Sequence, residues 1–348
     1  MSKPRYKVAL NGYGRIGRCV LRALHERGAG AGLEIVALND LADQASIEYL
    51  TRFDSTHGRF PGEVRVDGDC LHINGNCVKV LRESTPEAID WAGLGIDLLL
   101  ECSGQYTNRA QAERFLRAGA PRVLLSQPMA SEADVDATIV FGVNQDRLSG
   151  AERLVSNASC TTNCGVPLLK LLNEAVGLEY ASITTIHSAM NDQPVIDAYH
   201  HEDLRRTRSA FQSVIPVSTG LARGIERLLP ELAGRIQAKA IRVPTVNVSC
   251  LDITLQTTRD TSAEAINRVL REATQSGPLK GLVAYTELPH ASCDFNHDAH
   301  SAIVDGSQTR VSGPRLVNLL AWFDNEWGFA NRMLDVAGHF LDVSTAST

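Results

Sequence analysis

The sequence has no long apolar run, no excess of basic residues and no secretion signal, and each absence excludes a class of protein. No apolar run approaches the roughly 20 residues of a membrane span. The charged residues 1–6 are not followed by the apolar core of a signal peptide. A formal net charge of -6 argues against a nucleic-acid surface. We therefore expect neither a membrane nor a nucleic acid as a partner.

The cysteines also lack a pattern. Eight of them are spread over 348 residues in no disulfide framework, and no pair has the spacing of zinc ligands. We expect no disulfide framework, no metal site and a reducing, cytoplasmic compartment. A hydrophobic content of 44% and a charged content of 21% are typical of a globular protein, and the length indicates two domains or one large one.

The most informative stretch is residues 156–164, Ser-Asn-Ala-Ser-Cys-Thr-Thr-Asn-Cys. These polar residues are helix N-cap types, and the apolar run 166–172 that follows has helical spacing. Cys160 is therefore predicted to lie where a strand turns into a helix, whose dipole stabilises a reactive thiolate. The alternative is a buried, inert cysteine, which suits Cys164 better. Pro167 should bend this helix or delay its start.

Residues 7–24 read as a strand, the pattern Gly-x-Gly-x-x-Gly and a helix, the fingerprint of dinucleotide binding in its required context. Gly12 allows the tight turn, Gly14 lets the backbone approach a pyrophosphate, and Gly17 lets helix and strand pack closely. The pyrophosphate would lie at the helix N-terminus.

A second predicted strand, residues 33–38, is followed by Asp40, 23 residues past Gly17. A carboxylate at this place binds the adenosine ribose hydroxyls. It would repel a 2'-phosphate, so the sequence favours NAD over NADP. A plain glycine turn is the alternative interpretation.

The rest of the first half continues the alternation of strand and helix. Apolar runs at 97–102 and 122–126 are typical of buried parallel strands. Between them, residues 108–118 are predicted to form a helix that stops at Gly119. The pair Asn74-Gly75 indicates a hairpin turn. We expect an α/β Rossmann domain with a doubly wound parallel sheet.

In the second half, a β-rich run at 181–186 leads to His187, 27 residues after Cys160. A cysteine activated by a histidine, each at the end of its own strand, suits nucleophilic attack on a carbonyl. A histidine with a purely structural role is the alternative.

A polar loop, 191–216, carries three arginines at 205–208. They form either a solvated charge run or a phosphate grip. Residues 219–220 precede a predicted helix and offer donors to an anion. Arg242 is a charge within an apolar strand, so we expect it to point into a site.

The remaining elements indicate an α+β domain built on a mostly antiparallel sheet with helices on one face. They are strands at 246–256 and 316–323 and helices at 262–274 and 330–341. Ser262 is the expected N-cap of the first of these helices. We predict an NAD-binding domain at 1–158, a catalytic and substrate-binding domain at 159–325, and a C-terminal helix, about 326–348, that rejoins the first domain.

Four blocks of the sequence resemble the glyceraldehyde-3-phosphate dehydrogenase family: residues 11–18, 156–164, 242–245 and 324–328. The resemblance runs from about residue 7 to residue 341. It implies an NAD-dependent dehydrogenase that acts on a phosphorylated aldose and that is usually a homotetramer.

The resemblance also implies residue roles. Cys160 would attack the aldehyde to give a thiohemiacetal, and His187 would take the thiol proton and assist hydride transfer, leaving a thioester. Arg15 and Ile16 would contact the cofactor pyrophosphate, and Asn325 would bind the nicotinamide amide. The residues implied at the two anion sites are Ser159, Thr161, Thr219 and Gly220 at one, and Asp192, Arg206 and Arg242 at the other.

Two departures from the common family pattern stand out. Met190 replaces a threonine that contacts the substrate phosphate, and a thioether cannot donate a hydrogen bond. Residues 83–84, Glu-Ser, replace an acidic-arginine pair near the cofactor. Three stretches, 187–192, 197–200 and 294–306, resemble instead the branch of the family that oxidises D-erythrose 4-phosphate to 4-phosphoerythronate, a step in making pyridoxal phosphate.

The sequence therefore predicts oxidation of erythrose 4-phosphate with NAD through a Cys160 thioester, which is released mainly by water. Phosphorylating oxidation of glyceraldehyde 3-phosphate is the nearest alternative. A Cys-His hydrolase that uses its nucleotide domain only structurally, and a non-catalytic NAD sensor or scaffold, are the other two.

Overall fold

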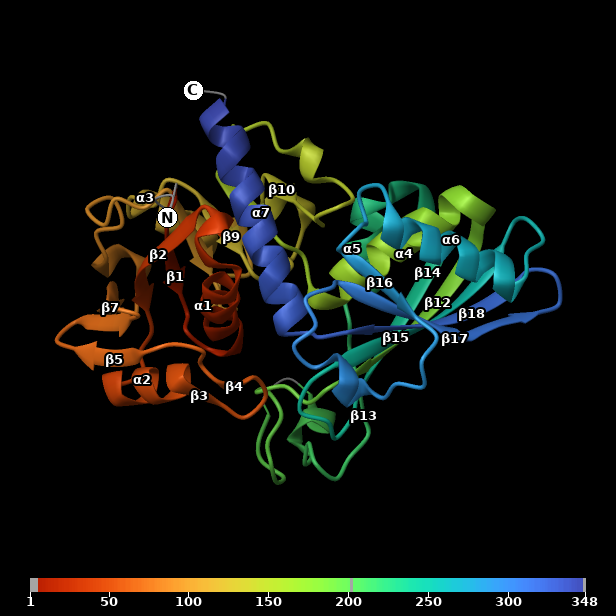
Figure 1. Ribbon diagram of the computed structural model, residues 1–348, viewed down its shortest axis with the longest axis horizontal. Helices are drawn as coiled ribbons and strands as arrows, with labels where there is room; N and C mark the ends of the chain where they lie inside the picture. Colours follow the sequence, from red (N-terminus) through yellow and green to blue (C-terminus); the bar gives the residue numbers. More distant parts are fainter. Residues whose placement is uncertain (1–5, 201–202, 347–348) are drawn as a thin grey trace. The chain divides into compact units, whose positions relative to one another are not determined.

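The computed structural model describes residues 6–200 and 203–346. Residues 1–5, residues 201–202 of the polar loop and the last two residues of the expected C-terminal helix lie outside the described part. The chain divides into two compact units (Figure 1). Unit 1 comprises Met1–Ser159 and Ala330–Thr348, and unit 2 comprises Cys160–Phe329.

Unit 1 contains a sheet in the order β10-β11-β9-β8-β1-β2-β7-β6-β5. Pairing is parallel from β10 to β7, whereas β6 and β5 join antiparallel. The strands are β1 (Tyr6–Asn11), β2 (Leu33–Asn39), β5 (Val64–Asp67), β6 (Cys70–Ile73), β7 (Asn76–Leu81), β8 (Leu98–Glu101), β9 (Val123–Leu125), β10 (Ala137–Thr138) and β11 (Leu154–Ser156), and β3 (Phe53–Asp54) pairs separately with β4 (Gly58–Arg59). The helices are α1 (Arg15–Arg27), α2 (Gln44–Arg52), α3 (Arg109–Arg117) and, from residue 330 onward, α7 (Trp327–Ala346).

The central strands are apolar because both faces of the sheet are covered. β8, β9 and β11 are buried along their whole length, as a parallel sheet between helices requires. On one side Trp91 and Phe115 pack edge to face, with ring centroids 6.0 Å apart. The predicted Rossmann sheet is confirmed, and the carboxyl ends of β8, β1, β2 and β7 meet at one edge of it.

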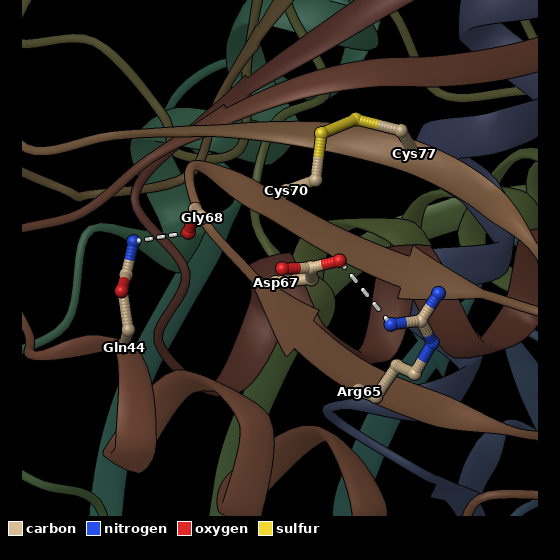
Figure 2. Close-up of a disulfide and its surroundings, with 6 residues drawn as sticks. All are labelled: Gln44, Arg65, Asp67, Gly68, Cys70 and Cys77. Carbon is tan, nitrogen blue, oxygen red and sulfur yellow. Dashed lines mark hydrogen bonds and ion pairs between the residues drawn. A yellow bond between two sulfur atoms is a disulfide. The ribbon is translucent and has the colours of Figure 1, made fainter.

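The hairpin of β6 and β7 forms as Asn74-Gly75 predicts, because both residues adopt positive φ, +50° and +85°. Its register makes Cys70 and Cys77 diagonal neighbours on one face, with Cα atoms 5.3 Å apart, and they form a disulfide (Figure 2). The cysteines were expected to fit no disulfide framework, and this local disulfide was not predicted. The register, not the spacing along the chain, brings the two sulfurs together.

Unit 2 contains a second sheet in the order β13-β14-β12-β15-β18-β17-β16. Only β12–β14 and β16–β17 pair parallel, so the sheet is mostly antiparallel, as expected. Its strands are β12 (Leu178–His187), β13 (Ile215–Val217), β14 (Ile236–Arg242), β15 (Ser249–Thr257), β16 (Val283–Thr286), β17 (Ala302–Ser312) and β18 (Leu316–Phe323).

Three helices, α4 (Cys160–Val176), α5 (Leu221–Leu228) and α6 (Ala263–Gln275), pack on one face of this sheet (Figure 1). The predicted cap of α6 is confirmed, since the Ser262 side chain accepts from the Ala265 N–H. The strand expected at 246–256 begins only at Ser249, because Val248 adopts a left-handed φ of +63° that no strand accommodates.

Two helix starts also differ from expectation. α4 begins at Cys160 and runs through Pro167, which therefore does not delay it. α7 begins at Trp327, before the expected residue 330, because the Asp324 carboxylate accepts from the N–H groups of Glu326 and Trp327 and caps it. In the described part of the chain no helix combines the length and the apolarity that crossing a membrane requires.

Candidate active site

A cleft in unit 1 lies at the carboxyl edge of the parallel sheet, lined among others by Gly12, Gly14, Asp40, Glu83 and Ser103. Gly12 adopts φ +89°, and a Cβ there would collide with the Ser103 backbone. Gly14 immediately precedes α1, where backbone N–H groups face an anion. This glycine cradle at a helix N-terminus fits a dinucleotide pyrophosphate.

Of the predicted cofactor residues, Asp40 lines this cleft, and Arg15 and Ile16 lie at the start of α1. Asp40 accepts hydrogen bonds from the N–H groups of Tyr13 (2.7 Å) and Ala42 (2.9 Å), which fixes its carboxylate at the cleft. Arg15 forms a bidentate ion pair with Asp54. Ile16 is half-buried in the first turn of α1.

A buried polar ladder beneath the cleft was not predicted from the sequence. Asn39 donates to Asn11 Oδ1 (2.8 Å) and to the Glu83 carbonyl (2.9 Å), and Asn11 donates to Glu101 (3.1 Å). Glu101 in turn accepts from the Ser103 N–H (2.8 Å). The ladder ties together the ends of four neighbouring strands. Two asparagines ending two apolar strands were the signal that could have revealed it.

In unit 2, the structure brings Cys160 and His187 together. Cys160 begins α4, His187 ends β12, and 3.8 Å separates Sγ from Nε2. His187 Nδ1 lies 2.8 Å from the Ser188 carbonyl oxygen. A carbonyl can only accept, so in the neutral ring Nδ1 carries the hydrogen and Nε2 presents its lone pair to the sulfur. The tautomer follows from these partners.

Burial sets the protonation of this pair. It raises the pKa of the Cys160 thiol to about 11, against the opposing influence of Arg242 and of the N–H groups at the start of α4. It also lowers the pKa of His187 to about 3, and the Arg242 charge lowers it further. Burial of both groups disfavours their charged forms, so a thiol and a neutral imidazole are the favoured states in the free protein. Cys164, one turn on, is fully buried, as its inert interpretation requires.

Asn325 lies close to this pair through shared hydrogen-bond partners. Its Oδ1 accepts from the hydroxyls of Ser188 (3.0 Å) and Ser249 (2.8 Å). With Oδ1 engaged, its Nδ2 is the group left to meet a ligand acceptor. The sequence does not predict these two hydrogen bonds, because they join residues that are far apart along the chain.

Two arginines of the 205–208 cluster form ion pairs with different aspartates. Arg206 pairs with Asp192 at 3.0 Å, whereas Arg208 pairs with Asp197 at 2.9 Å. Burial lowers the pKa of Arg242, opposed by the charges of Asp192 and Cys160, and Arg206 lowers it further. Arg206 is thus the member of the 205–208 cluster whose charge acts on Arg242.

The other expected anion-binding residues lie at helix starts. Ser159 and Thr161 flank Cys160, and Gly220 is the N-cap of α5. Thr219 accepts from the Leu221 N–H through its hydroxyl oxygen (3.2 Å). Met190 replaces a threonine of the family pattern. Its side chain is 45% exposed and therefore accessible.

Comparison with known families agrees with this arrangement. A model described as glyceraldehyde 3-phosphate dehydrogenase, NAD binding domain, matches residues 6–109, and one described as glyceraldehyde 3-phosphate dehydrogenase, C-terminal domain, matches residues 159–325. Together they cover more than half of the chain. The chain belongs to the glyceraldehyde 3-phosphate dehydrogenase family. NAD is accordingly its cofactor, and the cleft of unit 1 has the glycines and carboxylate that suit it.

The protonation of the pair predicts how Cys160 reacts with iodoacetamide in the free protein. A thiol with a pKa near 11 gains thiolate about tenfold per pH unit below that value. We therefore expect the alkylation rate of Cys160, followed by peptide mass spectrometry, to rise steadily from pH 6 to pH 9. A rate that levels off near pH 6–7 would instead indicate a thiolate–imidazolium pair.

Proposed function

We propose that this protein is an erythrose-4-phosphate dehydrogenase that oxidises D-erythrose 4-phosphate to 4-phospho-D-erythronate with NAD. The observation that carries the proposal is the contact of Cys160 Sγ with the unprotonated Nε2 of a neutral His187. A neutral imidazole can act as a general base, and this one contacts the Cys160 thiol, a nucleophile suited to an aldehyde carbon.

In the proposed mechanism, His187 Nε2 takes the Cys160 proton as the sulfur attacks the aldehyde, and returns it to the oxyanion to complete a thiohemiacetal. His187 next takes the hydroxyl proton while the carbon gives up a hydride. NAD supplies the hydride acceptor. A thioester on Cys160 results, and water cleaves it to the acid and the free thiol. The Ser188 carbonyl holds the imidazole throughout by accepting from Nδ1.

We assign binding of the phosphorylated substrate to the polar groups of unit 2. Arg242 and Arg206 supply positive charge, with Asp192 orienting Arg206, and guanidinium groups grip phosphate oxygens in pairs. The hydroxyls of Ser159, Thr161 and Thr219 and the N–H of Gly220 would serve the second anion site. Met190 cannot donate to a phosphate, which is our reason for favouring water over inorganic phosphate at the thioester.

We further propose a cytoplasmic homotetramer that acts in pyridoxine and pyridoxal phosphate biosynthesis. The polar loop of unit 2 exposes several large apolar side chains in its described part, which supports a contact surface there. They include Val195, Ile196, Leu204 and Val214, each at least 66% exposed.

Mutation of the pair tests the mechanism. We expect Cys160→Ser to abolish turnover while NAD still binds, and His187→Asn to lower kcat roughly 10²–10⁴-fold, the usual contribution of a general base. His339→Asn is a matched control, because the hydrogen bond and the ring contact of His339 within the described residues, to the Gln145 carbonyl (3.1 Å) and to Phe141, both lie in unit 1. Steady-state rates of NADH formation give the comparison. Full activity of either active-site variant would remove that residue from the mechanism.

The substrate is tested by NADH formation from erythrose 4-phosphate and from glyceraldehyde 3-phosphate, each with and without inorganic phosphate. We expect a preference for the four-carbon sugar and little effect of phosphate. A preference for the three-carbon sugar that strictly requires phosphate would establish the phosphorylating alternative and overturn the proposal.

A further inference from the structure

Val248 has a backbone conformation that needs an explanation. It is a buried, β-branched residue held at φ +63°, a conformation that costs free energy for such a side chain. The consequence is local, because β15 begins at the next residue, Ser249. The strained residue therefore delivers Ser249 to the first position of the strand that pairs with β12.

The Ser249 hydroxyl makes two hydrogen bonds, of which one is buried and the other part-buried. Its oxygen accepts from the Ser188 backbone N–H (3.1 Å), and its hydrogen goes to Asn325 Oδ1 (2.8 Å). Ser249 is 1% exposed and Ser188 is wholly buried. Because the Ser188 N–H is buried, loss of the Ser249 hydroxyl would leave it without its acceptor.

Ser188 connects this hydroxyl to His187. Its N–H is held by Ser249, and its carbonyl accepts from His187 Nδ1 (2.8 Å). The Ser188 hydroxyl differs, because within the described part of the chain Asn325 Oδ1 is its one hydrogen-bond partner (3.0 Å). Ser249 thus bonds to two groups, the backbone that orients the imidazole and the amide of Asn325. We call these two connections the backbone branch and the Asn325 branch. The Ser188 side chain belongs to the Asn325 branch alone.

We propose that Ser249 is a positioning residue that holds the backbone behind His187 and the side chain of Asn325 in one arrangement. Its effect on Cys160 passes through the Ser188 backbone and His187, and its effect on the cofactor passes through Asn325. The second branch rests on the proposed function, in which Asn325 binds the nicotinamide amide. A displacement of about 1 Å in such a pair lowers rates by up to about a hundredfold.

The two branches are separated by comparing Ser249→Ala with Ser188→Ala in the full-length protein. For Ser249→Ala we expect a rate of Cys160 alkylation by iodoacetamide at pH 8 that is severalfold lower than in the wild type. We also expect kcat/KM for NAD to fall by tenfold to a hundredfold. For Ser188→Ala, which keeps the backbone N–H and carbonyl, we expect unchanged alkylation and a fall in kcat/KM for NAD only.

Ser344→Ala is the matched control, because Ser344 is also buried and, among the described residues, its hydroxyl bonds to the Phe340 carbonyl of α7 alone (2.7 Å). Wild-type alkylation and turnover in Ser249→Ala would overturn the proposal, and so would identical behaviour of the two active-site variants. If Ser249→Ala does not fold, an undiminished kcat/KM for NAD in Ser188→Ala would contradict the Asn325 branch. Alkylation needs neither sugar nor NAD, so it reports on the positioning even if the wild type oxidises no sugar phosphate.

Discussion

The hydrogen bond between His187 Nδ1 and the Ser188 carbonyl is the interaction on which the candidate chemistry depends. It determines which ring nitrogen carries the hydrogen, and so leaves Nε2 free to accept the Cys160 proton. The bond exists because β12 ends at His187 and the chain turns there beside the first residue of β15. The arrangement of one sheet thereby selects the protonation state of a catalytic group.

Burial of Cys160 and His187 favours the same neutral forms as that hydrogen bond. In water a histidine beside a cysteine could share its proton as an ion pair, but here loss of solvent disfavours both charges, and Arg242 adds to the effect on His187. The resting pair is a thiol and an imidazole, so the thiolate forms as the bond to the substrate forms. Because the ring is buried, its partners inside the protein, the Ser188 carbonyl and the Cys160 sulfur, determine its protonation.

Much of the fold could be predicted because it follows from local pattern. Apolar runs gave the parallel strands, Asn74-Gly75 the hairpin, and Ser262 the cap of α6. The disulfide could not be predicted, because it depends on which residues of β6 and β7 lie opposite each other. The late start of β15 depends on the strained Val248, which no propensity favours. The meeting of Cys160 and His187 was expected from strand ends, but the direction of their pKa shifts was not, because burial is a property of the folded protein.

The contributions of Ser188, Ser249 and the Asn11–Asn39–Glu101 ladder were missed for the same reason. Each is a common polar residue whose role comes from a partner distant in sequence. In both units such residues lie at or beside the ends of strands, under the cofactor cleft in unit 1 and beside the reactive cysteine in unit 2.

The most direct measurement is mass spectrometry of the enzyme quenched during turnover with NAD and erythrose 4-phosphate. The account predicts that the peptide containing Cys160 carries the four-carbon phosphorylated acyl group as a thioester, and that the adduct increases when hydrolysis is slowed. Turnover without any adduct on Cys160, or with an adduct on another residue, would contradict the central claim that this sulfur is the nucleophile.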